Sequence, residues 1–454
     1  MSLSSRCAAL CGFVLIAATT TAFAAGPSNQ VDASFLVGKH RWMDAHAPNL
    51  KSFGTHVRDL ASNVKGFGRD TQPFGPSVPN IDTLVNFQGS FDAPGVDSNG
   101  NPASTWPYAM VGNAPTAGGI TLIDARIIPV SIRMLDANGK QAYANGHRLY
   151  MDVTQYVGKV LRSPVFSPAW YSSSSVPTQY TDAVQRAEFW SVMRQDWHTI
   201  MVPRVERPRV MSLPAGSYEY ALNKDGSCCA FVLVNENAFL TQLFPPTYPV
   251  DDTTIIGSAE LAGDMTTKTL ATFLFPNTYL FENNDPNQCC VLGFHEFDFE
   301  PGIPANGNRP RAYTMAYASW ISPGLFGPTF QDVTALSHEL AETFNDPLVT
   351  AFSASGGACG GAGQPLCLNE TPWWLSPNGN CQDNLEVGDV IEGLPDASTA
   401  IRLNGYTFHP QNEALLPWFG GKNTALDGAF SYPDESVLTA PNTSQQVGCV
   451  APLQ

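Results

Sequence analysis

One short stretch decides how this chain is interpreted: SHELAETFNDP, residues Ser337–Pro347. It differs by one residue from H-E-x-x-H, a helical motif in which two histidines hold zinc and the glutamate acts as general base. Here Glu342 replaces the second histidine, and a carboxylate is also an accepted zinc ligand. The stretch therefore predicts a metal-binding helix of the form H-E-x-x-E, which ends at Pro347.

Helical spacing divides this segment into two stripes. At 100° per residue, one face collects apolar side chains that are expected to enter a core. These are Val333, Leu336, Leu340 and Phe344. The opposite face collects His338, Glu342 and Asp346. A polar stripe of this kind either lines a metal site or is a solvated surface, and the segment that follows the helix favours the metal site.

A catalytic zinc site needs three protein ligands and one open position. His338 and Glu342 supply two, and the third is expected from an acid further along the chain: Glu386 first, then Asp346, then Asp389. Asp346 lies two turns, about 12 Å, beyond His338 on an ideal helix, so it reaches the metal only if the chain curls back. Each of these acids also has an ordinary alternative as a cap or turn residue. Zinc is the first choice of metal, with Mn²⁺ and Ca²⁺ left open.

Glu339 is the expected general base. It follows His338 by one position, so it can reach a metal-bound water without being a ligand. The alternative is that Glu339 is an ordinary exposed glutamate. Its role as general base depends on whether His338 binds a metal. A second pair, His295-Glu296, lies in a strand-like segment where alternation places His295 and Phe297 on one face. His295 could face a substrate there, or be a structural, hydrogen-bonded residue.

Residues 329–392, approximately, resemble a known protein family. The pattern is S-H-E-hydrophobic-A-E, then N-D-P, a Trp, and Glu386-Val387-Gly388-Asp389. It is similar to the phosphate-induced (EXORDIUM-like) secreted proteins and to related bacterial secreted proteins of unassigned function. The resemblance implies an extracellular or wall-associated protein that keeps the metal-binding fold, whether or not it is catalytic.

Other stretches extend the resemblance, and two features depart from it. QYTDAVQRAEFW at 179–190 and GAFSYPD at 428–434 resemble the bacterial group. Asn345 stands where the usual pattern has Thr, which matters little for the acid that follows. A long insert precedes Trp373, so the distance from the helix to Glu386 is harder to judge.

Composition and charge limit the class of protein. The chain has 454 residues, of which 43% are hydrophobic and 14% charged, with 38 Gly and 36 Pro. This is typical of a globular, loop-rich extracellular protein. Residues 1–24 read as a signal peptide, with Arg6, an apolar run and a small-residue cleavage site at Ala22-Phe23-Ala24. We therefore expect a secreted protein, or a periplasmic one in a bacterium with an outer membrane.

The net charge argues against some partners. It is −16, and it becomes −17 once the segment with Arg6 is removed. An acidic surface of this kind does not favour nucleic acid or anionic membranes. No membrane attachment is expected after signal cleavage, because no later segment is long and apolar enough to span.

Eight cysteines remain after the signal peptide, an even number that indicates disulfides in an exported protein. They are Cys228, Cys229, Cys289, Cys290, Cys359, Cys367, Cys381 and Cys449. The two vicinal pairs are expected to cross-link neighbouring strands, and the last group to hold the segment below the helix. A thiolate zinc cluster is the alternative, but no C-x-x-C spacing occurs.

The organisation follows from turn signals and periodicity. Residues 25–115 are expected to be a loop-rich N-terminal extension, and 116–454 an α+β domain whose irregular Cys-containing part begins at about 348. Strands are expected at 119–134, 228–235, 270–281, 289–299 and 312–321, and helices at 181–193 and 331–345. A hairpin turn is expected at 136–139. The order suggests a zincin-like lobe, a mixed sheet with a metal-binding helix.

Three functions remain open from the sequence. The first is a secreted metallopeptidase that hydrolyses a peptide or cell-wall substrate with a metal-activated water. The second is a non-catalytic, EXORDIUM-like extracellular protein that keeps the metal fold. The third is carbohydrate binding by Trp373-Trp374 and Trp418-Phe419, which could equally pack in the core.

Overall fold

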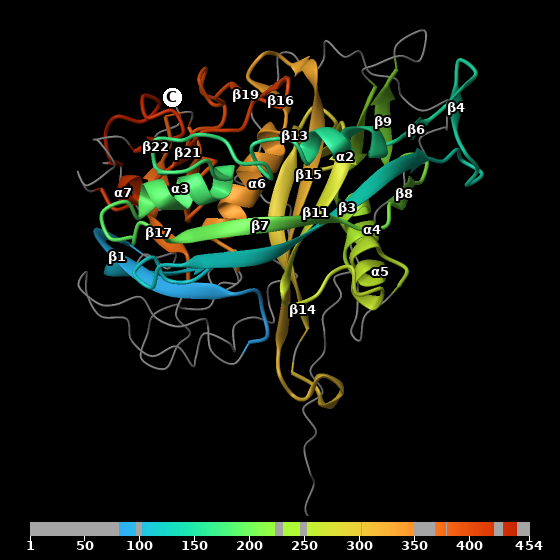
Figure 1. Ribbon diagram of the computed structural model, residues 1–454. Helices are drawn as coiled ribbons and strands as arrows, with labels where there is room; N and C mark the ends of the chain where they lie inside the picture. The colour runs from blue at the N-terminus through green and yellow to red at the C-terminus, as the bar shows by residue number, and fades with distance from the viewer. Residues whose placement is uncertain are drawn as a thin grey trace, which may run out of the picture.

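The computed structural model describes residues 81–96, 102–222, 230–245, 252–300, 302–348, 368–377, 379–421 and 430–442. The expected signal peptide and most of the expected N-terminal extension lie outside these ranges. The described residues form a strand-rich α+β fold (Figure 1). None of their helices is long and apolar enough to cross a membrane.

A curled, mixed sheet of eight strands forms the centre of the fold (Figure 1). Its strands are β3 (Ile120–Met134), β6 (Tyr150–Met151), β7 (His198–Val205), β8 (Arg209–Leu213), β11 (Thr269–Pro276), β14 (Gly293–Glu300), β15 (Arg311–Phe326) and β16 (Phe330–Asp332). Strands β3, β11 and β15 run parallel to one another. Strand β14 lies antiparallel to β15 at the edge of the sheet.

Both faces of this sheet are covered, which explains the apolar runs in its central strands. Every residue of β11 is buried. Leu270 and Leu274 pack on one face with α6 (Thr334–Asn345). Phe273 and Phe275 pack on the other face, in a cluster that also contains side chains of two helices. These are α4 (Glu236–Leu243) and α5 (Ile255–Leu261).

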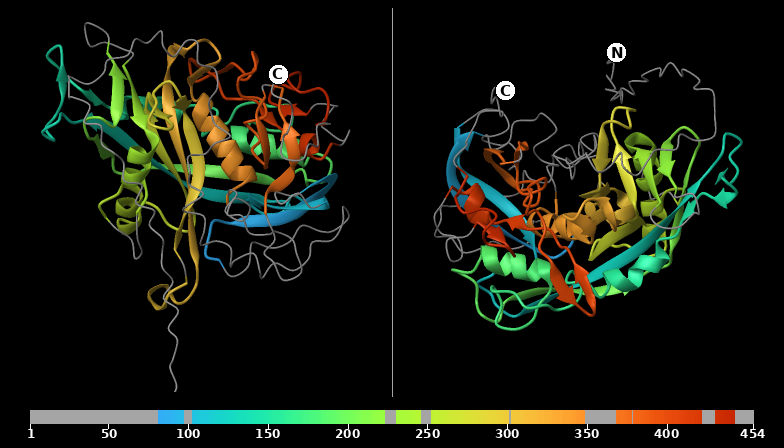
Figure 2. Two further views of the ribbon diagram at one scale, coloured as in Figure 1. Left: turned by 180° about the vertical axis from the view of Figure 1, so that it is seen from behind. Right: turned by 90° about the horizontal axis from the view of Figure 1, so that it is seen from above.

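Helix α6 lies against β15 and β14, and its apolar stripe is buried as the periodicity predicts. Val333, Leu336, Leu340 and Phe344 are each at most 1% exposed. Helix α3 (Tyr180–Glu188) lies beside α6 on the same side of the sheet (Figure 2). Helix α3 ends at Glu188 rather than at the expected Met193, and the residues that follow it form turns.

Smaller sheets and hairpins surround this centre. One four-stranded sheet contains β9 (Tyr218–Ala221), β10 (Phe231–Asn235), β12 (Thr278–Phe281) and β13 (Cys289–Val291). Short elements make up the rest: β4 (Tyr143–Ala144), β5 (His147–Arg148), α2 (Thr154–Val160), a 3₁₀ turn (Pro304–Asn306), β17 (Glu370–Leu375), β18 (Cys381–Asn384), β19 (Ile401–Leu403), β20 (Tyr406–Phe408), β21 (Glu413–Ala414), α7 (Leu416–Phe419) and β22 (Ser431–Tyr432).

The range expected to be loop-rich contains a regular hairpin in its described part. Strands β1 (Asn86–Val96) and β2 (Pro102–Val111) pair antiparallel. Their aromatic side chains are buried in the core, and this packing outweighs the turn-forming residues that lie within the two strands. Gly89 lies against the ring of Tyr108, where a Cβ would come within 2.4 Å of its hydroxyl oxygen. The absence of a side chain at Gly89 is thus required by its packing against Tyr108.

The predicted elements within the described residues are found, with two of them divided. The strand expected at 270–281 is β11 and β12, separated at Asn277, whose φ is +38°. The strand expected at 289–299 is β13 and β14. The turn at 136–139 is present, with a hydrogen bond from the Gly139 amide to the Asp136 carbonyl oxygen.

The cysteine pairing differs from the expectation in one respect. Cys289 and Cys290 are bonded to each other, so this vicinal pair does not cross-link two neighbouring strands. Cys381 is also disulfide-bonded. The other cysteines expected to form disulfides lie outside the described residues, and their pairing stays a prediction.

Candidate metal centre

The polar stripe of α6 is buried. His338 and Glu342 are 2% exposed, and Glu339 and Asp346 are 1% exposed. Ionisable side chains are almost never buried to this degree unless they are paired or hold a metal. The alternative of a solvated helix face is therefore wrong.

His338 and Glu342 meet one acid from the segment that follows β18. The His338 Nε2 atom lies 3.0 Å from Glu342 Oε2 and 3.4 Å from Asp389 Oδ1. Their ligand atoms all lie within 4.8 Å of one another. The acid that joins this pair is thus Asp389, which stood third in the order expected from the sequence.

Backbone and side-chain donors fix the two carboxylates of this group. The amides of Gly388 and Asp389 donate to Glu342 Oε1 over 3.0 and 3.3 Å. The side-chain amide of Gln382, on β18, donates to Asp389 Oδ2. One oxygen of each carboxylate is thereby held, and the other faces His338. Such outer hydrogen bonds orient the ligands of metal sites.

His295 joins the site from the edge strand β14. Its Nδ1 atom lies 3.4 Å from Glu342 Oε2, 3.7 Å from Glu339 Oε2 and 3.9 Å from Glu386 Oε2. Its Nε2 atom is 3.1 Å from the carbonyl oxygen of Asp346. Two further groups within 4.8 Å result: His295 with Glu339 and Glu342, and His295 with Asp346 and Glu386. Both Glu386 and Asp346 therefore lie in the site, grouped with His295 rather than with His338.

The cluster carries a large excess of negative groups. It contains two imidazoles and five carboxyl groups, those of Glu339, Glu342, Asp346, Glu386 and Asp389. Among the described residues, the ion pairs of these carboxylates are with His295 and His338, and none is with Lys or Arg. Five buried carboxyl groups exceed what two imidazoles can compensate, so the cluster has to retain protons or bind cations.

The excess of negative groups shifts the pKa values of the cluster. Burial, together with the charge of Glu342, raises the pKa of Asp346 to about 8 and that of Asp389 to about 7. The same two causes raise the pKa of Glu386 well above its usual value. Burial opposes a charged His338, yet Glu342 and Glu339 outweigh it and raise the pKa of this imidazole. The protein chain alone thus favours protons where a cation would also be stabilised.

The spacing of the ligand atoms fits a metal ion. Two ligands about 2.1 Å from a tetrahedral zinc lie roughly 3.4 Å apart. The separations of His338 Nε2 from Glu342 and Asp389, 3.0 and 3.4 Å, are close to this value. Neither oxygen of Asp346 has a hydrogen bond of normal geometry, although the side chain is buried. An imidazole with carboxylates is a donor set that suits zinc, and Mn²⁺ as well.

A second layer of residues braces the centre and was not foreseen. Tyr180, on α3, donates to Glu413 Oε1 over 2.6 Å and also contacts the carbonyl oxygen of Gln411. Gln411 in turn donates its side-chain amide to the carbonyl oxygen of Gly388 over 2.8 Å and its backbone amide to Ser337 Oγ. Tyr180 lies in the stretch at 179–190, and the described part of 428–434 contains β22, which pairs with the strand of Glu413. No motif in the sequence pointed to Glu413.

The tryptophans expected in a groove or the core belong to the core. Trp374 is 0% exposed and Trp418 is 4% exposed. Their rings meet at 5.9 Å in a T-shaped contact, and the Trp374 indole donates to the carbonyl oxygen of Asn384. Trp373 is half-buried. The two buried rings offer no face to a sugar, which removes the main support for carbohydrate binding.

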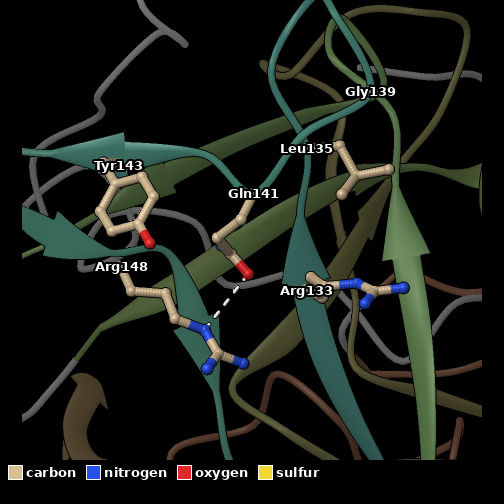
Figure 3. A pocket seen from close by; sticks show the side chains of 6 residues that line it. All are labelled: Arg133, Leu135, Gly139, Gln141, Tyr143 and Arg148. Atoms are coloured by element: carbon tan, nitrogen blue, oxygen red, sulfur yellow. Dashed lines mark hydrogen bonds between the residues drawn. The ribbon is translucent and has the colours of Figure 1, made fainter.

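A surface cavity of about 440 Å³ lies elsewhere, at the β4–β5 hairpin (Figure 3). It is lined by Arg133, Leu135, Gly139, Gln141, Tyr143 and Arg148. Arg148 Nε donates to Gln141 Oε1 over 3.2 Å. None of the clustered histidines and acids lines this cavity, so it is separate from the candidate metal centre.

Gly388 leaves room for the ring of His338. A Cβ at this position would lie 2.3 Å from His338 Nδ1 and 2.6 Å from Cε1. Gly388→Ala is expected to lower the free energy of unfolding by about 1–3 kcal/mol, because a buried ring has no free space to move into. Urea unfolding measures this loss.

Gly158→Ala is the matched control, since a Cβ at Gly158 meets nothing within 4 Å. It is expected to be neutral or slightly stabilising, because Gly158 lies within helix α2. Equal stability of the two variants would contradict the tight packing of His338 on Gly388.

Comparison with known proteins gives no relative: no family model, no curated protein and no solved structure matches this chain. The function is therefore argued from the centre itself.

Proposed function

We propose that this protein is a metal-dependent hydrolase of zincin-like type, with peptides as its substrate class. The observation that carries the proposal is the buried group of His338, Glu342 and Asp389, with Glu339 beside it on the same helix. A single H-E-x-x-E segment supplies two ligands and a base, and the segment after β18 supplies the third ligand.

His338, Glu342 and Asp389 would hold the metal. A divalent cation bound there supplies Lewis acidity, which polarises a scissile carbonyl and makes water more acidic. Three protein ligands are the number that catalytic zinc sites use, so a bound ion would keep a position open for water or substrate. Zinc is the first candidate, as the donor set indicates.

Glu339 would be the group that accepts a proton. Its Oε1 atom is 3.9 Å from His338 Nε2, which is too far for a direct hydrogen bond, so Glu339 lies beside the proposed ligand His338 without pairing closely with it. Gly293 faces this carboxylate, and a Cβ there would lie 2.5 Å from Glu339 Oε1. The absence of a side chain at Gly293 thus keeps the space in which Glu339 lies.

The position of the edge strand β14 favours a peptide as the substrate. Among the described strands, β14 pairs only with β15, and its first residue, Gly293, lies against Glu339. An extended peptide can add to such an edge through backbone hydrogen bonds. This would bring its carbonyl groups next to the proposed base.

One observation favours a second function, the non-catalytic EXORDIUM-like alternative. Every member of the cluster is buried, and the most exposed side chain, that of Glu386, is only 11% exposed. Closed metal sites are typical of structural metals, whereas catalytic sites keep an open position. A centre of this kind would stabilise an extracellular protein without turnover.

Metal analysis of the full-length purified protein tests the proposal. Wild type is expected to contain zinc or manganese, and His338→Ala to bind it more than about 100-fold more weakly, because an inner ligand matters more than the outer ones. His147→Ala is the matched control, since His147 is exposed on β5. Wild type without metal, and with none after incubation with Zn²⁺ or Mn²⁺, would refute the proposed function.

A further inference from the structure

Two of the three candidate sets in the cluster share no residue, and the third, His295 with Glu339 and Glu342, overlaps both of them. One of the two separate sets is His338, Glu342 and Asp389. His295, Asp346 and Glu386 also place one ligand atom each within 4.8 Å of one another. Each set has one imidazole and two carboxylates. A single ion cannot be bound by both sets at ordinary ligand distances of about 2.1 Å.

We infer that this protein binds a second divalent cation, held by His295, Asp346 and Glu386 beside the ion at His338. This inference rests on the proposed metal site at His338, and it makes that site binuclear. The ligand class is again a zinc or manganese ion, because the donors are one imidazole nitrogen and carboxylate oxygens.

His295 is prepared to act as a ligand. Its Nε2 atom lies 3.1 Å from the backbone carbonyl oxygen of Asp346, an acceptor, so Nε2 would keep its proton and donate there when Nδ1 binds a metal. The lone pair is then on Nδ1, which faces Glu339, Glu342 and Glu386. A histidine ligand whose other nitrogen donates to a carbonyl oxygen is the usual arrangement in metal sites.

The surroundings of Asp346 give independent support for a second ion. It is 1% exposed, and neither of its carboxylate oxygens has a hydrogen bond of normal geometry. A buried carboxyl group whose hydrogen-bonding capacity is not filled is costly, so a native protein seldom keeps one without a reason. The helix ends here, with Asp346 as the C-terminal cap residue at φ −140°, and the carboxylate lies in the group with His295 and Glu386.

Glu342 lies between the two sets. Its Oε2 atom is 3.0 Å from His338 Nε2 and 3.4 Å from His295 Nδ1, while Oε1 accepts the two backbone amides of the segment at Gly388. One oxygen can therefore bridge two ions, as in two-metal hydrolytic sites, where the ions are about 3.5–4 Å apart. Two dications also offset most of the charge of the five carboxylates, which one dication does not.

Metal stoichiometry of the full-length protein decides the matter. The protein is stripped with a chelator and reloaded with Zn²⁺ or Mn²⁺, and bound metal is measured after removal of free ion. Wild type is expected to hold two ions, and Asp346→Asn to hold one. Mn²⁺-loaded wild type should give an exchange-coupled paramagnetic resonance signal, and Asp346→Asn the hyperfine pattern of an isolated ion.

The outcomes separate this inference from the proposed function. One ion in wild type would overturn the second site and leave the first in place, whereas no ion would overturn both. Two ions in both wild type and Asp346→Asn would overturn the assignment to this set. Glu188→Gln is the control, a buried carboxyl group outside the cluster that accepts the Leu416 amide, and it should still hold two ions.

Discussion

Glu339→Gln is expected to lower kcat/KM for peptide hydrolysis by about 10²–10⁴-fold while metal content and thermal stability stay at wild-type values. The amide has the shape of the carboxylate but cannot accept a proton. Glu339 is outside the His338, Glu342 and Asp389 set, so its replacement leaves those ligand atoms in place. The measurement is hydrolysis of a fluorogenic peptide library by the zinc-loaded protein, with metal content and melting temperature measured on the same samples.

Glu188→Gln is the matched control for this experiment. It also removes a buried carboxylate from a helix, but one on α3 outside the cluster. It is expected to keep wild-type activity. If wild type hydrolyses no peptide although it holds metal, the non-catalytic alternative replaces the peptidase. If Glu339→Gln is as active as wild type, Glu339 is not the base.

Removal of the metal should have the largest effect on stability. A ligand present at about 1,000 times its Kd stabilises the native state by about 4 kcal/mol. For a chain of this length that corresponds to a melting temperature roughly 5 °C lower after treatment with a chelator. The physical reason is that the buried carboxylates lose the cation that compensates their charge. Differential scanning calorimetry with and without chelator measures the shift.

Adding back single metals identifies the ion. The stripped protein is expected to recover its melting temperature with Zn²⁺ or Mn²⁺, and less with Ca²⁺, which prefers six or more oxygen ligands. His338→Ala provides the control, since chelator should change its melting temperature less than that of wild type. A wild-type protein whose melting temperature is unaffected by chelator, after its metal content has been shown to fall, would contradict a stabilising metal centre.

Local patterns predicted much of the fold. Helix α6 followed from a period of 3.6 residues, and its apolar face is the buried one. Strands β3 and β15 followed from the alternation of side chains, and β11 lies in a segment predicted to be a strand. The β1–β2 hairpin was missed because its glycines and prolines read as turns, whereas aromatic packing in the core decided its conformation.

What the sequence by itself determined about the centre is the arrangement on one helix. His338 and Glu342 are four residues apart, so helical geometry alone places them on one face, and Glu339 follows beside them. These statements depend only on bonds within one turn. They needed no knowledge of the rest of the chain.

Only the tertiary structure decided which residues complete the centre. His295 reaches α6 because β14 is the antiparallel edge strand under the helix, and Asp389 because the segment after β18 hydrogen-bonds Glu342 through its amides. Asp346 joins His295 and not His338, since two helical turns separate it from the latter. Sequence spacing does not encode such contacts, because they arise from sheet register and from the path of a connection of more than forty residues between α6 and Asp389.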